Sequence, residues 1–400
     1  MSKTEFVSAI VGPPQENKTR IILSAFSHFD TGLNRATVMQ IQPLTDGLIT
    51  HTSRITYEPA GRSYIIRKIN PIFNFDAIAT NLQLIEKAQE KSSDQIPSYW
   101  CPVKFYNSKE SGWKVYRDSA GRGWVLMDYI GGEVYNAADE IPQTDRPDAA
   151  YSIGAGIAIF EHIMSAIPEE SWRKTLPLHR EMDYHISYLD SVLAGQQVVL
   201  NLHREPIIVQ KSEALTAKYQ DRISDLLNTI KHYKYLSKYE NDLGSYFIHD
   251  DLKINNLIFR RLENKKLFVV SLVDLDTIGV GPALIDIADA IRSTGNPAGE
   301  NPENIDSVDM NVLIIDRIID GYLDKTSEYG LRSLPDDIRI RIYKECQKLL
   351  FMLGIRFFAD ALIGNKYFKV KTGEPEDLNL FRAEVQFKAL ERLEANKTMY

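Results

Sequence analysis

Hydrophobic and polar positions in the first third of the chain follow the pattern of a small domain of strands and helices. Residues 52–57 and 63–69 carry the β-branched and aromatic side chains that favour strands. Pro59 and Gly61 supply a turn signal between them, so we expect an antiparallel hairpin. The same region is expected to contain helices over 18–29 and 76–90 and a second strand pair over 112–116 and 123–130.

Beyond residue 130 the apolar positions recur mainly at the spacing of amphipathic helices, interrupted by one short segment of strands. This segment contains strands over 246–248, 257–259 and 269–273, and acidic and amide side chains gather at the strand ends. Residues 294–302 are rich in Gly, Asn and Pro and are expected to form a surface loop near them. Helices are predicted over 149–164, 213–239, 308–323, 336–362 and 377–393.

These patterns predict an α+β fold of two lobes, a small β-rich lobe over residues 1–130 and a large, mainly helical lobe over 131–400. The fractions of 44% hydrophobic and 25% charged residues are typical of globular proteins. A net charge of −7 does not favour nucleic acid as a partner. Because no long apolar run is present and Cys101 and Cys346 lack paired spacing, we expect a cytoplasmic protein without membrane contact.

The candidate chemistry lies in two acidic segments at neighbouring strand ends. Asp251 and Asn256 stand five residues apart in a loop, and Asp274 follows the next strand. Phosphoryl transfer to an alcohol needs a carboxylate that accepts the hydroxyl proton and oxygen ligands that hold Mg²⁺ across nucleotide phosphates. An ordinary turn of Asp and Asn residues is the competing interpretation. Burying such residues between apolar strands costs free energy, however, unless a partner such as a metal balances their charge.

The order of these residues resembles that of a known enzyme family. The pattern formed by His249, Asp251 and Asn256, followed by Asp274 and Asp276, is similar to the catalytic and metal loops of aminoglycoside and choline-type phosphotransferases. Within that superfamily the chain most resembles the N-acetylhexosamine 1-kinases. The similar segments include 27–29, 45–47, 64–66, 253–256, 273–278, 289–292 and 354–360.

This resemblance implies a bilobal, protein-kinase-like fold and an ATP- and Mg²⁺-dependent reaction on a small molecule, with a sugar as the leading acceptor. Asp251 would be the catalytic base, His249 would brace its loop, and Lys253 would neutralise the transferring phosphoryl group. The remaining roles would fall to Asn256 and Asp274 as Mg²⁺ ligands, Asp276 as a second metal candidate, and Asp286 as a hydrogen-bonding support of the loop.

Nucleotide binding is expected at the end of the second hairpin strand and at the connection between the lobes. Arg67 and Lys68 stand where kinases place the phosphate-binding cation, and only one can face the site because adjacent strand residues point to opposite faces. We favour Arg67 and keep Lys68 as the alternative. Met127 and Tyr129 belong to the expected hinge over 126–130, whose backbone would contact adenine, with a plain domain linker as the alternative.

The acceptor site is expected on a C-terminal helix. Arg356 and Tyr367 are the candidates for contacts to sugar hydroxyls, and Asp360 belongs to the same segment, although Arg356 and Asp360 could instead pair four residues apart on the helix. Leu48 occupies a position where the similar kinases have a sugar-binding His, and Gln83 one where they have Glu. A kinase of another hydroxyl acceptor, or a silent nucleotide-binding regulator, therefore remains an alternative.

Overall fold

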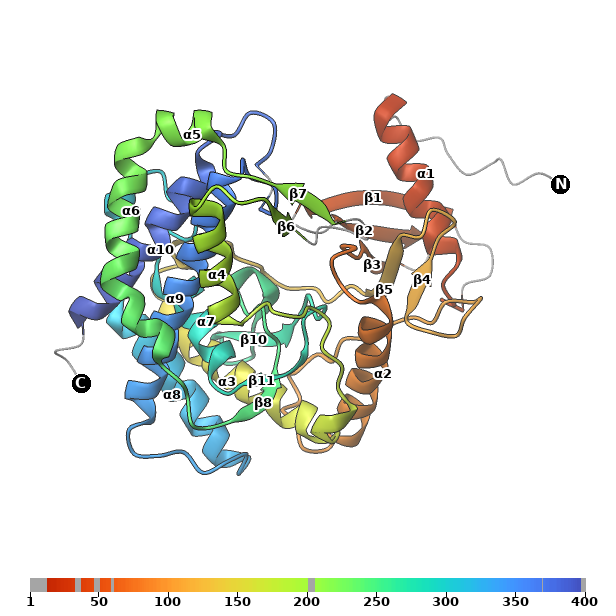
Figure 1. Cartoon of the computed structure of the whole chain (residues 1–400). Coiled ribbons are helices and arrows are strands. Elements are labelled where there is room, and N and C mark those ends of the chain that lie inside the picture. Colours follow the sequence, from red (N-terminus) through yellow and green to blue (C-terminus); the bar gives the residue numbers. More distant parts are fainter. Residues whose placement is uncertain are drawn as a thin grey trace.

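The structure, a computed structural model, describes residues 13–32, 37–46, 51–58, 61–200, 206–368 and 370–396. The N-terminal region is built on an antiparallel five-stranded sheet with the order β1-β2-β3-β5-β4 (Figure 1). The predicted hairpin is confirmed as the pair β2 and β3. The strands are β1 (Thr37–Asp46), β2 (His51–Glu58), β3 (Arg62–Lys68), β4 (Val115–Arg117) and β5 (Gly123–Asp128).

Each face of this sheet packs against one helix. Trp124 and Leu126 of β5 share a hydrophobic cluster with α1 (Pro13–Ser27), whereas Val125 and Met127 share the main core with α2 (Phe75–Lys91). Cross-strand partners point to the same face of a sheet. Arg67 is opposite Val125 and Lys68 is opposite Trp124, so Arg67 lies on the face that meets the rest of the molecule.

The C-terminal region is mainly helical, as predicted. The prediction of a single helix over 213–239 is wrong, because the helix is interrupted at Tyr219, whose φ and ψ are −115° and 30°. Tyr219 and Lys218 both contact Glu376, so tertiary contacts override the helical periodicity at this point. The helices are α3 (Arg146–Ser165), α4 (Met182–Leu193), α5 (Glu213–Lys218), α6 (Gln220–Tyr233), α7 (Ile285–Gly295), α8 (Val312–Glu328), α9 (Ile338–Leu362) and α10 (Leu378–Ala395), with 3-10 turns at 138–140, 169–171, 234–238, 254–256 and 305–307.

Two glycines let the long helices α3 and α8 approach closely. A Cβ atom on Gly154 would lie 1.8 Å from the carbonyl oxygen of Ile318, and one on Gly321 would lie 1.9 Å from that of Tyr151. Only a residue without a side chain fits these positions. The helix pair therefore forms a tightly packed base for the strands that carry the acidic loops.

Three two-stranded antiparallel sheets complete the region: β8 (Ser245–Ile248) with β11 (Gly279–Pro282), β9 (Leu257–Arg261) with β10 (Leu267–Leu272), and β6 (Val198–Leu200) with β7 (Ile207–Val209). The two regions of the chain are joined after β5, where Glu133 pairs with Phe259 of β9.

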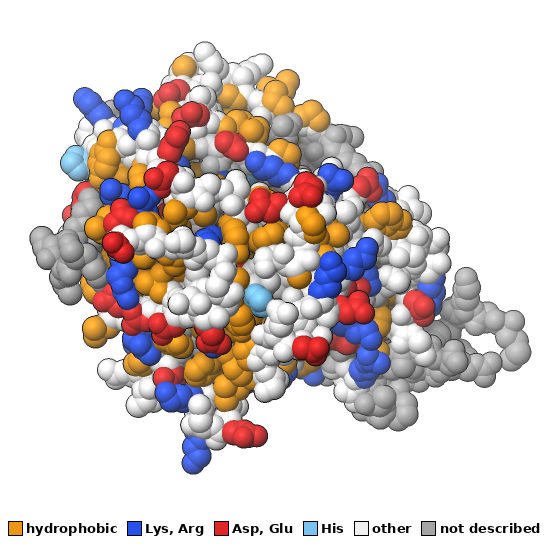
Figure 2. All heavy atoms as spheres, turned by 90° about the horizontal axis from the view of Figure 1, so that it is seen from below, with side chains coloured by type: hydrophobic (Ala, Val, Ile, Leu, Met, Phe, Trp, Pro, Cys, Tyr) orange, Lys and Arg blue, Asp and Glu red, His pale blue; other side chains and the backbone are white. Residues whose placement is uncertain are grey.

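The expected surface loop 294–302 lies mostly inside the protein, because Asn296 is buried and donates to the Gly299 carbonyl at 2.7 Å. Acidic and basic side chains are intermixed with hydrophobic ones over the face seen in Figure 2. Among the residues that the structure describes, none of the helices combines the length and the apolar character of a membrane-spanning segment.

Candidate active site

The loop between β8 and β9 carries the predicted base. His249 is fully buried at its start, where its N–H donates to Asp286 Oδ2 at 2.6 Å and its Nε2 lies 2.9 Å from the Val273 carbonyl oxygen. The Val273 bond ties this loop to the segment that follows β10. His249 thus contacts both loops, in agreement with the expectation that it braces the Asp251 loop.

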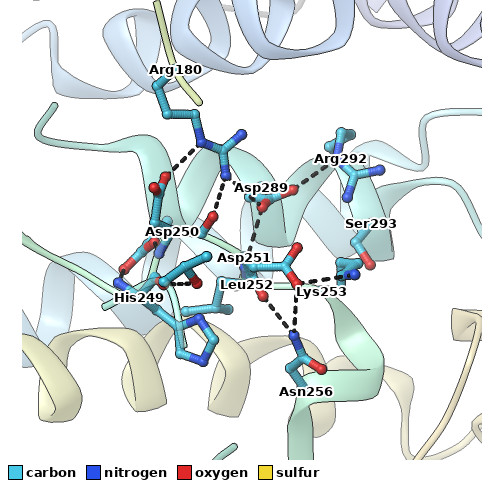
Figure 3. A network of polar contacts seen from close by, with 12 residues as sticks. Arg180, His249, Asp250, Asp251, Leu252, Lys253, Asn256, Asp289, Arg292 and Ser293 are labelled. Carbon is cyan, nitrogen blue, oxygen red and sulfur yellow. Dashed lines mark hydrogen bonds and ion pairs between the residues drawn. The ribbon is translucent and has the colours of Figure 1, made fainter. Parts of the chain in front are cut away.

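Asp251 and Asn256 face each other across this loop (Figure 3). Asn256 Nδ2 donates to the Asp251 backbone oxygen at 2.7 Å and lies 3.4 Å from Asp251 Oδ2. The ammonium of Lys253 lies 3.1 Å from the same Oδ2 atom. Three of the predicted site residues therefore meet at one carboxylate, which remains 33% exposed.

The second acidic segment is adjacent to the first. Val273 N donates to the Asn256 backbone oxygen at 2.9 Å, which places Asp274 next to the Asp251 loop. Arg67 forms ion pairs with both Asp274 and Asp276. Arg67 is therefore the cation of β3 that reaches the acidic loops, and Lys68 is on the opposite face of the strand.

Asp286 supports the loop from the start of α7, and this prediction is confirmed. Its two carboxylate oxygens accept from the backbone of His249 and of Asp250, the latter at 2.9 Å. Burial raises the pKa of Asp286 to about 8, although both backbone hydrogen bonds act in the opposite direction. The carboxyl group orders two consecutive peptide units just before Asp251.

Further supports on α7 were not predicted individually. Leu252 N donates to Asp289 Oδ2 at 3.2 Å (Figure 3). Ile254 N donates to Ser293 Oγ at 2.9 Å. Asp286, Asp289 and Ser293 follow one another at helical spacing, so they share one face of α7. This spacing is a sequence signal that could have identified the whole support.

A network of ion pairs extends from α7. Arg180 Nε donates to Asp250 Oδ1 at 2.6 Å, and its guanidinium also lies 3.3 Å from Asp289. Arg292 binds Asp289 at 2.8 Å and Glu300 at 2.6 Å. Burial raises the pKa of Asp289, but the charges of Arg292 and Arg180 outweigh it and hold the pKa well below its ordinary range.

The predicted hinge residues lie at the end of β5. Met127 is buried in the core on the α2 side of the sheet. Tyr129 N donates to the Ser63 carbonyl at 3.1 Å, so this backbone donor is already used within the sheet. The guanidinium of Arg54 lies 3.9 Å from the centre of the Tyr129 ring.

The predicted acceptor residues meet at a separate cavity of about 300 Å³. Arg356, Asp360 and Tyr367 all line it, together with His179 and Tyr188. The expected alternative of an Arg356–Asp360 pair is not what the structure contains. Asp360 instead accepts from the backbone N–H groups of Tyr367 at 2.7 Å and Phe368 at 2.9 Å, so it holds the loop that carries Tyr367.

The oxygen donors of the acidic loops fit a divalent metal bound to a nucleotide. Among the described residues no cluster of three or more His, Cys, Asp or Glu side chains is arranged as a metal site. Magnesium in nucleotide sites is usually held by one or two carboxylates with the phosphates, so Asp274, Asp276 and Asn256 supply enough oxygen donors. The buried Oδ2 atom of Asp276 lacks a hydrogen-bond partner, and coordination to a metal ion would satisfy this oxygen. Leu48, at the position where the similar kinases have a sugar-binding His, lies outside the described residues.

Known proteins share this architecture. A choline kinase from Cryptosporidium parvum Iowa II superposes with a TM-score of 0.52 at 12% identity, covering 96% of both chains. A spectinomycin phosphotransferase in complex with ADP and spectinomycin gives a TM-score of 0.50 at 14% identity, covering 94% of this chain and 98% of the other. A glucosamine kinase is more distant, with a TM-score of 0.44 at 11% identity over 92% of this chain and 80% of the other.

These superpositions confirm the predicted α+β, kinase-like fold, whereas the N-acetylhexosamine kinase branch stays a prediction. The sequence itself matches the model of the phosphotransferase enzyme family over residues 40–306, well over half of the chain. The chain therefore belongs to the phosphotransferase enzyme family.

Proposed function

We propose that the chain is an ATP-dependent kinase that phosphorylates a hydroxyl group of a small molecule, with the anomeric hydroxyl of an N-acetylhexosamine or related sugar as the leading acceptor. The observation that carries this proposal is the contact of Asp251 with Asn256 and Lys253 beside the Arg67, Asp274 and Asp276 ion pairs. Base, cation and metal ligands of a phosphoryl-transfer site are thus adjacent.

Nucleotide binding is assigned to the lobe of residues 1–130 and its junction with the lobe of residues 131–400. Arg67 is buried on the face of the sheet that meets the acidic loops, so it would contact the phosphates. Met127 and Tyr129 at the end of β5 would line the adenine side. Asn256, Asp274 and Asp276 would hold Mg²⁺, which would neutralise phosphate charge when bound.

The transfer step would begin with the acceptor hydroxyl in front of Asp251. The acceptor oxygen attacks the γ-phosphorus, the bond from that phosphorus to the oxygen bridging to the β-phosphate breaks, and ADP leaves. The hydroxyl proton passes to an Asp251 carboxylate oxygen. Lys253, already 3.1 Å from Asp251 Oδ2, would stabilise the negative charge of the transferring group.

A panel of free sugars tests this function. The full chain with Mg²⁺ and ATP should release ADP only when an acceptor is present, and phosphorus NMR should show an acid-labile phosphate at the anomeric carbon. Formation of one phosphate ester per ADP supports the proposal. A stable ester at another hydroxyl contradicts the anomeric assignment, and nucleotide binding without transfer to any acceptor contradicts the kinase assignment.

A further inference from the structure

The acceptor cavity contains a cation without an acidic partner. Arg356 projects from α9 and lies 5.8 Å and 5.4 Å from the ring centres of Tyr367 and Phe368. Among the described residues no carboxylate forms an ion pair with it. Burial lowers the pKa of Arg356 from its ordinary value, but guanidinium groups remain charged in proteins.

The neighbouring acids are already in use. Both oxygens of Asp360, four residues further along α9, accept backbone hydrogen bonds from Tyr367 and Phe368, and one also accepts from Asn379 at 2.9 Å. Asp250, whose charge also acts on Arg356, is bound by Arg180 at 2.6 Å. A partly buried cation whose acidic neighbours are occupied calls for an anion from a ligand.

The two histidines that line the cavity are neutral. Burial, followed by the charge of Arg356, lowers the pKa of His185 to about 3, so this ring is uncharged at physiological pH. Burial likewise lowers the pKa of His179, which also lines the cavity. Buried His179 Nδ1 and Tyr188 Oη lack hydrogen-bond partners among the described residues, so a ligand with hydroxyl groups suits these walls.

We propose that this cavity binds a sugar acid, a monosaccharide with one carboxylate that pairs with Arg356 and with hydroxyl groups that meet His179 and Tyr188. The assignment rests on the proposed function and deepens it, since it names the acceptor class. A single cation matches a monoanionic carboxylate better than a dianionic phosphate ester, and guanidinium binds carboxylate with two parallel hydrogen bonds. An amino sugar or aminoglycoside would place a second positive charge next to Arg356.

The position of the cavity agrees with an acceptor site. His179 lines its wall, and a hydrogen bond with the Asp250 backbone acts on the pKa of this histidine. The next residue, Arg180, binds the Asp250 side chain and its backbone oxygen, the latter at 2.7 Å. The cavity wall is therefore connected directly to the residue that precedes Asp251.

Calorimetric binding to the full chain without nucleotide tests the acceptor class independently of transfer chemistry. The probes are D-glucuronate and D-galacturonate, the matched neutral sugars D-glucose and D-galactose, the cationic D-glucosamine, and D-glucose 6-phosphate. Each uronate should bind roughly ten- to hundredfold more tightly than its neutral match, the range expected for one charge-assisted hydrogen-bonded contact. This result in the native chain suffices even if a variant fails to fold.

Three variants locate the effect. Arg356→Gln should abolish the preference for uronates, and Arg356→Lys should retain part of it because the charge remains without the planar fork. Arg317→Gln removes an equal charge from the partly exposed surface of α8 and should leave the preference unchanged.

Four results would overturn the assignment: equal affinity for the acid and its neutral match, tighter binding of glucosamine or of the phosphate ester, absence of binding by both uronates, or a preference that persists in Arg356→Gln. Binding of a uronate through Arg356, without phosphate transfer to any acceptor, would instead contradict the proposed kinase function alone.

Discussion

Asp251 is held by buried neighbours while it stays accessible itself. Its side chain is 33% exposed, whereas His249 and Asp286, which fix the loop, are buried. Asp250 and Asp274 both have a φ of 67°, a conformation that aspartate tolerates better than most residues. Charged groups that are oriented before the reaction stabilise a transition state without the cost of reorganising them.

Arg67 and Lys68 provide a matched pair for testing which cation serves the nucleotide. Arg67→Gln removes the partner of Asp274 and of buried Asp276, so it should lower the free energy of unfolding by about 3–5 kcal/mol. It should also weaken Mg·ATP binding roughly ten- to hundredfold. Lys68→Gln, on the opposite face of β3, should change each quantity by less than about 1 kcal/mol.

Urea unfolding and calorimetric titration with Mg·ATP measure both effects. A larger loss of nucleotide affinity in Lys68→Gln than in Arg67→Gln would reverse the assignment.

Helices supply the rigidity on which these residues depend. One face of α7 binds the backbone N–H groups of His249, Asp250 and Leu252 in the Asp251 loop through Asp286 and Asp289. Below the strands, α3 and α8 cross where Gly154 meets the backbone of Ile318. Movement of α7, or of the α3 and α8 pair, would therefore shift the acidic loops.

Gly154→Ala should separate α3 from α8 and destabilise the protein. A Cβ atom 1.8 Å from the Ile318 carbonyl oxygen cannot be accommodated by rotation of a flexible side chain. We expect a loss of about 1–3 kcal/mol or more in the free energy of unfolding. Gly131→Ala is the control, because its added Cβ would meet only Tyr129 Cε1 at 3.8 Å. Equal stability of the two variants in urea would show that the helices do not pack as described.

Glu161 should make the α3 and α8 pair sensitive to pH. Burial raises the pKa of this carboxyl to about 7, and the charge of Arg332 only partly offsets the effect. Because the folded state binds the proton more tightly than the unfolded state, the stabilising contribution is complete below the unfolded pKa of about 4.3 and is lost as the pH rises through 7.

The Glu161→Gln variant should remove this dependence. Between pH 5 and 7 the free energy of unfolding of the native chain should fall relative to the variant, with a slope of at most about 1.4 kcal/mol per pH unit. Urea unfolding across that range measures the difference. Parallel curves for the two proteins would mean that Glu161 titrates alike in the folded and unfolded states.

For the whole molecule, local rules predicted four strands of the sheet, most of the helices and the acidic loops, but neither β1 nor α4. The period of two along a strand limited the choice between Arg67 and Lys68 to one residue, and cross-strand register then placed Arg67 inside. Arg180 could not be predicted, since its contact with Asp250 spans 70 residues and depends on the tertiary fold. For the same reason periodicity missed the break at Tyr219 and the burial of residues 294–302, where long-range contacts decide the backbone conformation.

The most direct test of the central claim is the turnover number of Asp251→Asn with Mg·ATP and an accepted sugar, measured beside the native chain and Asp225→Asn, an exposed control on α6. We predict a turnover number lower by about 10²–10⁴-fold for Asp251→Asn, as expected for loss of a general base, with nucleotide affinity nearly unchanged and the control fully active. A native turnover number in Asp251→Asn would contradict the assignment of this carboxylate as the base.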